Sequence, residues 1–456
     1  MKLRPLVIQT VLFVLGTAVG GCALAAQIAA ENDFSLAVEA FESQQYDTAI
    51  ARLEEAIRRG KDTGRIRNLL GWSLYKKGDL IRAKEEFERA LRIDPNDPNA
   101  FYAHEGLGWI AYKGNHYDRA LAAFAESLRI KPGYHNAHSG LGWSYLGKGD
   151  LIRAAANFKA ALASAPGNLD ATRGLGFVAY GRGDWQEAID RLRDALRRDE
   201  RDSLARSTLG WAHYYKGEHA QASRTFQEVA RREPAWAAPP LGLAWIAEKQ
   251  GRPAEAKAGF RAAMQKSAAF VAKPEFRKLL AGRPEWIDLW RDLGWALFHQ
   301  RAFAKAEAEF RALLARHPND PDGLRGLGYS LYSLKRYRES IPPLKRALAS
   351  NAALPPIREQ IEIPGAFGLH TIMSDAASSL AWSYYFTGKF RPALRGFRRV
   401  TKRYPEWADP WSGLGWTLLK LGDRAAAEHA FRRSLKARSG YADALNGLKA
   451  LGKRVQ

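Results

Sequence analysis

The chain has 456 residues, 46% of them hydrophobic and 26% charged, a composition typical of folded proteins that excludes a largely disordered chain. Lysine and arginine outnumber aspartate and glutamate by 70 to 48, so the formal net charge is +22. This surplus favours anionic partners in general, but many of the cations stand near predicted helix ends, where they complement the helix dipole. Charge alone therefore does not indicate nucleic acid, and we expect no nucleic-acid partner.

The N-terminus has the pattern of an export signal. Lys2 and Arg4 precede an uncharged stretch over residues 5–30, whose most apolar part is LVIQTVLFVLG. Cys22, the only cysteine of the chain, follows in the sequence VGGC. This segment resembles the lipobox of bacterial lipoproteins, and the resemblance implies cleavage before Cys22 and acylation of its thiol.

Two other interpretations of this segment remain open. Ala23-Leu24-Ala25 is an A-x-A site for ordinary signal cleavage. The 26 uncharged residues are also enough to span a bilayer uncut. All three interpretations predict export of the remainder of the chain, and we expect it in the periplasm. We assign residues 1–25 to the signal peptide, with a possible lipobox that ends at Cys22. The lipoprotein interpretation adds attachment to the outer membrane through Cys22.

An eleven-residue segment recurs ten times along the chain, for example as GLGWSYLGKGD over Gly140–Asp150 and GLGFVAYGRGD over Gly174–Asp184. In every copy a large aromatic residue directly follows Gly or Ala. Successive copies are 37, 34, 34, 34, 34, 50, 34, 53 and 34 residues apart. We call these ten aromatic residues the ladder: Trp72, Trp109, Trp143, Phe177, Trp211, Trp245, Trp295, Tyr329, Trp382 and Trp416.

Further positions recur at fixed distances from the ladder. Eleven residues after each ladder aromatic stands Ala, or once Ser, and four residues later stands Phe or Leu. Proline often closes the unit, as at Pro95 and Pro132. This 34-residue pattern of Leu-Gly, a Gly turn, Ala, Phe, Ala and Pro resembles the tetratricopeptide repeat family over roughly residues 34–452.

The resemblance implies an all-α fold, an α-solenoid in which about eleven helix-turn-helix units form a superhelix that ends in a C-terminal capping helix. Each unit is predicted to contain two amphipathic helices, broken at Gly-Asp as at Gly78-Asp79. Neither helix could bury its apolar face alone, so stacking of neighbouring units would bury it. A weaker copy opens the array around Tyr46, and the capping helix is predicted over Tyr441–Leu451.

Two insertions divide the array into parts over residues 34–266, 285–350 and 373–452. The first insertion, 267–284, contains PEFRKLLAGRPEW and is predicted to form one short additional helix. The second, 351–372, contains Pro-Pro and Pro-Gly pairs, which favour an irregular loop. It is a candidate docking loop for a partner, or a tolerated surface insertion.

The ladder is predicted to face away from the surfaces on which helices pack. Each helical residue advances by about 100°, so His138, Leu141, Gly142 and Tyr145 gather on one side of their helix. Trp143 lies about 160° from the centre of that side. In the tetratricopeptide repeat family the face on which Trp143 stands lines the concave groove in which ligands bind.

Residues three positions after a ladder aromatic share its face and are mostly aromatic as well. If eight half-exposed Trp residues lined a groove, they would present roughly 800 Å² of apolar surface, which a ligand should cover. The candidate ligand groove comprises Trp72, Tyr75, Trp109, Tyr112, Trp143, Phe177, Tyr180, Trp211, Tyr214, Trp245, Trp295, Phe298, Tyr329, Tyr332, Trp382, Tyr385 and Trp416.

The alternative is that the ladder covers itself. Facing helices lie about 8–10 Å apart, so the Trp of one repeat could pack on the Tyr of the next. A ligand groove and a self-packed ladder can also coexist.

No motif of catalysis or cofactor binding stands out in the sequence. His135 and His138 are three residues apart on one predicted helix, without a cysteine or carboxylate at ligand spacing, so we expect packing rather than a metal site. The Gly-x-Gly triplets fall inside predicted helices and do not form a dinucleotide loop. We therefore expect a protein that is not an enzyme and binds no cofactor.

Two functions fit these features. The first is a cell-envelope scaffold that holds an anionic polysaccharide in its groove, because the organisation resembles repeat-containing lipoproteins and periplasmic segments of bacterial exopolysaccharide secretion systems. The second is an adaptor for pilus, secretion or envelope-biogenesis complexes that takes a peptide or helix of another envelope protein into the same groove. A third, a structural spacer, would bind no ligand there.

Overall fold

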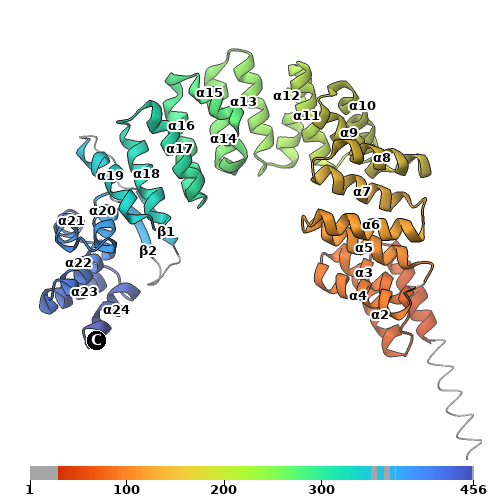
Figure 1. Ribbon diagram of the computed structural model, residues 1–456, viewed down its shortest axis with the longest axis horizontal. Coiled ribbons are helices and arrows are strands. Elements are labelled where there is room, and N and C mark those ends of the chain that lie inside the picture. Colours follow the sequence, from red (N-terminus) through yellow and green to blue (C-terminus); the bar gives the residue numbers. More distant parts are fainter. Residues whose placement is uncertain (1–28, 96, 351–356, 364–369, 375, 454–456) are drawn as a thin grey trace, which may run out of the picture. The chain divides into compact units, whose positions relative to one another are not determined.

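The computed structural model describes residues 29–95, 97–350, 357–363, 370–374 and 376–453. Most of these residues are helical, and successive helices pack against one another in pairs (Figure 1). The chain divides into two compact units, unit 1 over residues 1–225 and unit 2 over residues 226–456. The predicted all-α architecture of stacked helix pairs is confirmed within each unit.

Unit 1 begins with a helical segment over residues 29–42. Its further helices are α2 (Tyr46–Arg58), α3 (Gly64–Lys77), α4 (Leu80–Ile93), α5 (Ala100–Lys113), α6 (Tyr117–Ile130), α7 (His135–Gly147), α8 (Leu151–Ser164), α9 (Leu169–Arg182), α10 (Trp185–Arg198) and α11 (Ser203–Lys216). The boundary between the units falls in α12 (His219–Arg232).

Unit 2 continues the repeats and contains the two insertions. Its elements are α13 (Ala238–Lys249), α14 (Pro253–Val271), α15 (Pro274–Ala281), the 3₁₀ turn η1 (Pro284–Trp286), α16 (Ile287–His299), α17 (Phe303–Arg316), α18 (Pro321–Ser333), α19 (Tyr337–Ala349), β1 (Ile357–Ile363), β2 (His370–Ser374), α20 (Ala376–Phe386), α21 (Phe390–Arg403), α22 (Ala408–Lys420), α23 (Arg424–Ala437) and α24 (Ala442–Ala450).

The Gly-Asp pairs end one helix of a repeat and begin the next. Gly78 has φ of 89°, a left-handed conformation that glycine adopts without steric cost, and it ends α3. The side chain of Asp79 then accepts a hydrogen bond from the backbone N–H of Arg82, which caps α4. The two residues therefore fix the turn between the helices of a repeat.

In most repeats a buried phenylalanine packs against the next repeat. Phe87 on α4 is fully buried. A Cβ atom added at Gly71 would lie 2.7 Å from its ring, and one added at Gly106, in the next repeat, would lie 2.3 Å from it. Because the ring lies against two glycine backbones, the glycines of GLGW allow close approach of α3, α4 and α5. They are packing residues, as the sequence indicated.

Gly106→Ala is expected to lower the free energy of unfolding by about 1–3 kcal/mol, because the new methyl group would overlap the Phe87 ring. Chemical denaturation followed by circular dichroism measures the change. Gly133→Ala is the matched control, since a Cβ at Gly133 meets no atom within 4 Å. Its effect should stay within about 0.5 kcal/mol. Equal effects of the two substitutions would contradict the packing role of Gly106.

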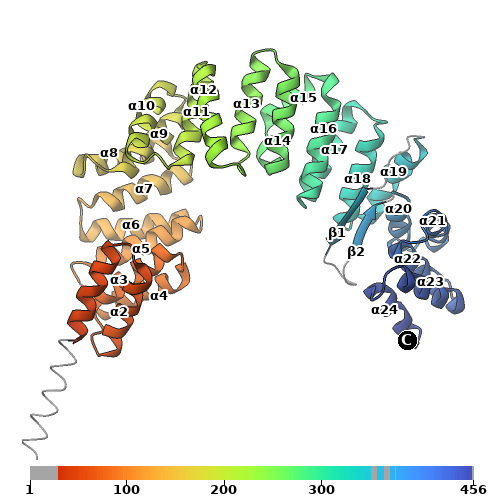
Figure 2. The same cartoon turned by 180° about the vertical axis from the view of Figure 1, so that it is seen from behind.

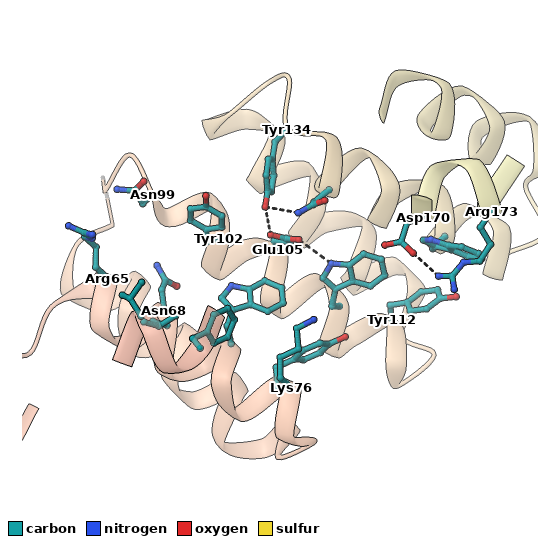
Figure 3. Close-up of a pocket in the computed structure, with 18 of the residues that line it drawn as sticks. Arg65, Asn68, Lys76, Asn99, Tyr102, Glu105, Tyr112, Tyr134, Asp170 and Arg173 are labelled. Carbon is teal, nitrogen blue, oxygen red and sulfur yellow. Dashed lines mark hydrogen bonds and ion pairs between the residues drawn. The ribbon is translucent and has the colours of Figure 1, made fainter. Parts of the chain in front are cut away.

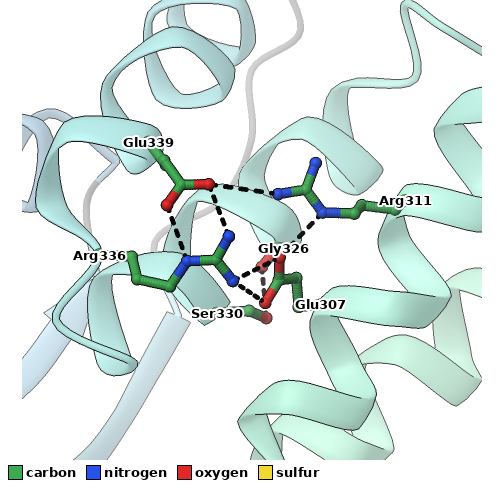
Figure 4. Close-up of polar contacts among 6 residues, drawn as sticks. All are labelled: Glu307, Arg311, Gly326, Ser330, Arg336 and Glu339. Atoms are coloured by element: carbon green, nitrogen blue, oxygen red, sulfur yellow. Dashed lines mark hydrogen bonds and ion pairs between the residues drawn. The ribbon is translucent and has the colours of Figure 1, made fainter.

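Charged networks also connect repeats within unit 2. Arg336 donates to both carboxylate oxygens of Glu307, at 2.9 and 2.7 Å, and to Glu339 at 2.8 and 2.6 Å (Figure 4). Arg311 donates to Glu307 at 2.8 Å. The network joins α17 to α19, and its four charges balance one another.

The first insertion is helical in part. α14 has a non-helical residue, Ser267 (φ −158°, ψ 96°), at the position where the insertion was predicted to begin. α15 and η1 follow, and Phe276 of α15 packs on Phe260 of α14 with ring centres 4.7 Å apart. The insertion thus adds to the core of unit 2.

The second insertion contains a two-stranded antiparallel sheet (Figure 2). β1 pairs with β2, with Ile361 opposite Ile372, and β2 lies against α20 and α22. The prediction of an irregular loop over 351–372 is therefore wrong for these strands. The neighbouring prolines and glycine suggested irregular backbone, but β-branched residues in IREQIEI and HTIM favour extended strands.

The predicted export signal and Cys22 lie outside the described residues. Among the residues that the structure describes, we found no helix with both the length and the apolar character needed to cross a membrane.

Candidate functional site

The ladder tryptophans pack on the buried phenylalanine fifteen residues later in the chain. In the seven resolved pairs the ring centres are 5.1–5.5 Å apart and the planes cross at 69–85°, an edge-to-face geometry. The pairs are Trp72–Phe87, Trp109–Phe124, Trp143–Phe158, Trp245–Phe260, Trp295–Phe310, Trp382–Phe397 and Trp416–Phe431.

The two ladder positions without tryptophan also indicate that the ladder tryptophans serve to pack on phenylalanine. Phe177 and Tyr329 belong to the repeats that carry Leu192 and Leu344 in place of the phenylalanine. A tryptophan therefore stands in the ladder only in repeats that have a phenylalanine fifteen residues later as its packing partner. This pairing explains why a tryptophan follows the small residue in the repeats that carry the phenylalanine.

The prediction that the ladder faces away from the packing surfaces is accordingly wrong in part. Phe298, Tyr329 and Trp382 in unit 2 are only 2%, 1% and 3% exposed, and Trp143 in unit 1 is 9% exposed. The helical-wheel angle placed these rings on a separate face. In the structure Trp143 packs on Phe158 of the following helix, and Trp382 packs on Phe397 in the same way. Three of these residues, Trp143, Tyr329 and Trp382, belong to the ladder and are covered by other side chains of the chain, and so is the neighbouring Phe298.

In unit 1 the ladder nevertheless borders a cavity of about 870 Å³. Figure 3 shows Asn68, Tyr102, Glu105 and Tyr112 projecting toward it from α3 and α5. Six predicted groove residues line the cavity: Trp72, Tyr75, Trp109, Tyr112, Trp143 and Phe177. The other lining residues are Phe34, Val38, Phe41, Arg65, Asn68, Leu69, Lys76, Asn99, Tyr102, Glu105, Tyr134, Asn136, Asp170, Arg173 and Leu204.

The remaining predicted residues of unit 1 form a separate ring cluster. Trp185 and Tyr215 stack with ring centres 4.9 Å apart and planes 20° apart. Tyr180 contacts both of these rings, and Trp211 contacts Tyr214 at 5.7 Å. Tyr180, Trp211 and Tyr214 therefore do not contribute to the cavity, and sequence spacing alone did not separate them from the residues that do.

In unit 2 the predicted groove residues contact side chains of neighbouring helices. The indole N–H of Trp382 donates to the carboxylate of Asp409, at 3.0 and 3.2 Å, and the hydroxyls of Ser378 and Tyr441 donate to the same carboxylate at 3.2 and 3.3 Å. Burial raises the pKa of Tyr332 well above its usual value. These groups hold successive repeats together.

The other predicted rings of unit 2 also contact neighbouring aromatic residues. Trp245 lies 6.5 Å from the ring of Phe276, and Trp295 lies 6.0 Å from the ring of Tyr329. Tyr385 meets Trp382 edge-on at 5.5 Å, and the half-buried Trp416 packs on Phe431.

Sequence reasoning missed Glu105, which is 4% exposed on the wall of the cavity. One carboxylate oxygen accepts a hydrogen bond from the Tyr134 hydroxyl at 2.6 Å, and the other accepts from the indole N–H of Trp109 at 3.3 Å. Burial raises the pKa of Glu105 to about 7, although hydrogen bonds from Tyr134, Trp109 and Asn136 and the charge of Lys76 lower it. A carboxyl group that titrates near neutral pH therefore borders the aromatic cavity.

Asn68 is the second polar group that the sequence did not single out. Its side-chain oxygen is buried and has no hydrogen-bond partner, and the residue is 7% exposed. Asn68 and Glu105 both stand four residues before a ladder tryptophan, one helical turn away on the cavity side. Glu105 is the only acidic residue among the ten residues at this position, a signal that the sequence does contain.

Basic residues line the same cavity. Arg173 pairs with Asp170 at 2.6 Å and with Asp202 at 2.9 Å, and its guanidinium lies 5.1 Å from the ring centre of Trp143. One face of that indole is thus covered. Lys113 is not part of the lining, but it lies 4.5 Å from the ring centre of Tyr75, which is part of it. Burial raises the pKa of Tyr75 to about 12.

The two histidines considered in the sequence contact amides. His135 lies 3.0 Å from the Asn168 amide nitrogen, and His138 lies 3.4 Å from the Asn157 amide oxygen. Within the described ranges of the chain, no cluster of His, Cys, Asp and Glu side chains could hold a metal ion.

Comparison with known proteins identifies the repeats. A profile of the tetratricopeptide repeat family matches residues 34–98, 82–135, 207–269, 271–321, 291–355 and 379–442, and a second profile of that family matches residues 145–212. No curated protein matches the chain.

Solved structures with similar folds include a tetratricopeptide repeat protein from Parabacteroides merdae ATCC 43184, at 17% identity and a TM-score of 0.40, over 56% of this chain and 98% of that one. PilW, described as a type IV pilus biogenesis factor, is 22% identical with a TM-score of 0.40, over 48% of this chain and 98% of PilW. YrrB, described as having an unusual peptide-binding site, is 22% identical with a TM-score of 0.34, over 41% of this chain and 94% of YrrB.

The family profiles match more than half of the chain, and the matched segments fold as the paired helices described above. The chain therefore belongs to the tetratricopeptide repeat family.

Proposed function

We propose that the chain is a non-enzymatic protein-binding scaffold whose unit 1 holds an extended segment of a partner protein in the aromatic cavity. Repeats of this family form scaffolds and adaptors for other proteins. The observation that carries the proposal is the cavity of about 870 Å³, in which six ladder and neighbouring rings alternate with amide and charged groups. Its volume is within the range of about 300–1,000 Å³ that is typical of ligand sites.

The arrangement of the lining favours a polypeptide. Lining residues run from Phe34 to Leu204, so they come from successive repeats. An extended segment could contact one repeat after another, placing apolar side chains on the rings. Asn68, Asn99 and Asn136 offer amides to its backbone.

An anionic polysaccharide, as in exopolysaccharide secretion or assembly, is the second candidate ligand. Indole and phenol rings beside Arg65 and Lys76 favour it, because aromatic faces stack on sugar rings and cations attract uronates. Two observations disfavour a polysaccharide. The indoles of Trp109 and Trp143 pack edge-to-face on phenylalanine rings, and Arg173 covers one face of Trp143. These contacts leave fewer exposed ring faces for sugar stacking than the sequence predicted.

The two ligands can be separated directly. A library of random twelve-residue peptides is panned against the full chain, and neutral and uronate-containing oligosaccharides are titrated against its tryptophan fluorescence. The double variant Tyr102→Ala/Leu204→Ala removes two lining side chains that are 40% and 58% exposed. Peptides enriched by the wild type should be lost with this variant.

Ile81→Ala/Ile152→Ala is the matched control, because both side chains are apolar, 77% and 78% exposed, and outside the cavity lining. It should retain the same peptides as the wild type. If oligosaccharides change the fluorescence and no peptide depends on Tyr102 and Leu204, the protein-binding proposal is wrong and the polysaccharide candidate replaces it.

We also propose that the scaffold acts in the cell envelope, at the outer membrane. The support is the N-terminal sequence alone, with its basic start, apolar stretch and Cys22. Cys22→Ser should abolish incorporation of labelled palmitate and move the protein from the membrane fraction to the soluble periplasmic fraction. A wild-type chain that takes up no fatty acid would exclude lipidation, and one that remains in the cytoplasm would exclude export.

A further inference from the structure

Glu105 is a buried carboxylate without a positive partner. It is 4% exposed, and no basic side chain within the described residues forms an ion pair with it. The groups that stabilise its charge by hydrogen bonding are all neutral: the Tyr134 hydroxyl, the Trp109 indole and the Asn136 amide. A buried ionised carboxylate is costly unless a cation compensates it. Each oxygen still has acceptor capacity on the cavity wall.

The basic residues of the cavity do not fill this role. Arg173 is neutralised by Asp170 and Asp202. The guanidinium of Arg65 lies 5.2 Å from the ring centre of Phe34. Lys76 is solvent-exposed and acts on Glu105 only through its field.

Asp409 in unit 2 is a comparable buried carboxylate that accepts more hydrogen bonds from the chain. Asp409 also accepts from a ladder indole, that of Trp382, and from a tyrosine, Tyr441. It receives a further hydrogen bond from Ser378. Glu105 has the indole, the tyrosine and the neighbouring Asn136 amide, and it also borders a cavity. The unfilled acceptor sites of Glu105 therefore face space that a ligand can enter.

Asn68 adds a second acceptor to the same space. Its buried side-chain oxygen has no hydrogen-bond partner, and the residue lines the cavity with Glu105, Trp72 and Trp109. A group that satisfies both acceptors must donate several hydrogen bonds and tolerate aromatic walls. Ammonium and guanidinium groups meet both requirements, since they carry several donors and are attracted to aromatic faces.

We propose that this part of the cavity is a subsite for a lysine or arginine side chain of the partner segment, with Glu105 as its counterion and Asn68 as a second acceptor. The subsite rests on the proposed function, because the cation is presented by a bound polypeptide. Paired carboxylate and aromatic contacts would position that side chain and set the register of the segment.

Acetylated, amidated pentapeptides Ala-Ala-X-Ala-Ala test the subsite, with arginine, lysine, citrulline or glutamate at X. Citrulline has nearly the shape of arginine and no charge. Each peptide is titrated into the full chain and its affinity is measured by calorimetry. The arginine and lysine peptides should bind at least about tenfold tighter than the citrulline and glutamate peptides. Equal affinities for arginine and citrulline would overturn the proposal.

Variants locate the contact on the protein. Glu105→Gln and Asn68→Ala should each weaken the arginine peptide, Glu105→Gln by about tenfold or more. Asn68→Ala removes a side-chain oxygen that has no hydrogen-bond partner in the structure, so it tests this acceptor directly. Glu126→Gln is the matched control, because Glu126 is an exposed glutamate of α6 outside the cavity. Unchanged affinity in both cavity variants would overturn the subsite.

The pH profile provides a readout that a purely structural glutamate would not change. Binding of the arginine peptide should tighten by about tenfold from pH 6 to pH 8 in the wild type, because Glu105 ionises in this range. The other charged groups that line the cavity are Arg65, Lys76, Asp170 and Arg173. Glu105→Gln should remove the pH dependence, and an unchanged profile would overturn the assignment.

The failure of this subsite and of the proposed function can be told apart. Library peptides that require Tyr102 and Leu204 but ignore Glu105 would overturn the subsite and leave the scaffold proposal standing. An arginine pentapeptide that needs Glu105, with no library peptide retained, would keep the subsite and overturn the binding of an extended segment.

Discussion

Replacing Phe158 by alanine is expected to lower the free energy of unfolding of unit 1 by about 3–5 kcal/mol. The ring is fully buried on α8 and lies against the backbones of Gly142 and Gly174 and the edge of Trp143. Its removal would leave a void that two glycines cannot fill. Chemical denaturation, followed by circular dichroism at several protein concentrations, measures the loss.

A double-mutant cycle tests the pairing of tryptophan with phenylalanine. Trp143→Phe combined with Phe158→Leu reproduces the native combination of Phe177 and Leu192. The two single substitutions should together cost about 0.5–1.5 kcal/mol more than the double substitution, because either one alone breaks the edge-to-face contact. Strictly additive costs would show that the two positions are independent, contrary to the pattern of the ladder.

Glu105→Gln is expected to change how stability depends on pH. Burial raises the pKa of Glu105 from 4.5 to about 7, so the folded chain binds this proton more tightly than the unfolded chain. The contribution is therefore fully present below pH 4.5 and is lost as pH rises toward 7. Between pH 4 and pH 8 the variant should gain about 3 kcal/mol relative to the wild type, since glutamine does not ionise.

Thermal and chemical unfolding at a series of pH values would measure this difference. Glu126→Gln is again the control, since Glu126 is exposed and paired with Arg129, and it should not reproduce the gain. A variant whose stability runs parallel to that of the wild type from pH 4 to pH 8 would mean that Glu105 is well solvated, which contradicts its burial.

The repeat architecture could be predicted because the residues that make it are local and periodic. Gly78 and Asp79 fix a turn through their own backbone and side chain, and the same pair recurs in other repeats. The Phe87 ring between Gly71 and Gly106 gives each repeat the same contact with the next. Such a pattern is visible in one chain without any relative for comparison.

The strands of the second insertion could not be predicted with the same ease, because they occur once. Pro and Gly pairs dominate their surroundings, whereas the pairing of Ile361 with Ile372 depends on contact between segments eleven residues apart. IREQIEI alternates only weakly between apolar and polar residues, and no second copy of the segment supports a strand. The surrounding Pro and Gly pairs therefore favoured a loop.

The candidate site was predictable only in part. Spacing identified the rings on the correct helices, but it could not tell the cavity-lining Trp109 from the buried Trp382, because their local sequences are alike. That difference depends on which groups the neighbouring repeat presents. Glu105 was missed because a single acid in a helix is ordinarily a solvated surface residue. Its burial follows from Tyr134, in the next repeat.

Fluorine NMR of the chain labelled with 5-fluorotryptophan tests the central claim most directly, namely that unit 1 binds a polypeptide on its half-buried ladder rings while the ladder of unit 2 is structural. The 14 tryptophan signals are assigned by single Trp→Phe substitutions. Addition of a library-selected peptide should shift the signals of Trp72 and Trp109 in a saturable manner and leave that of Trp382 unchanged. A shift of Trp382 with no response from Trp72 and Trp109 would contradict the account.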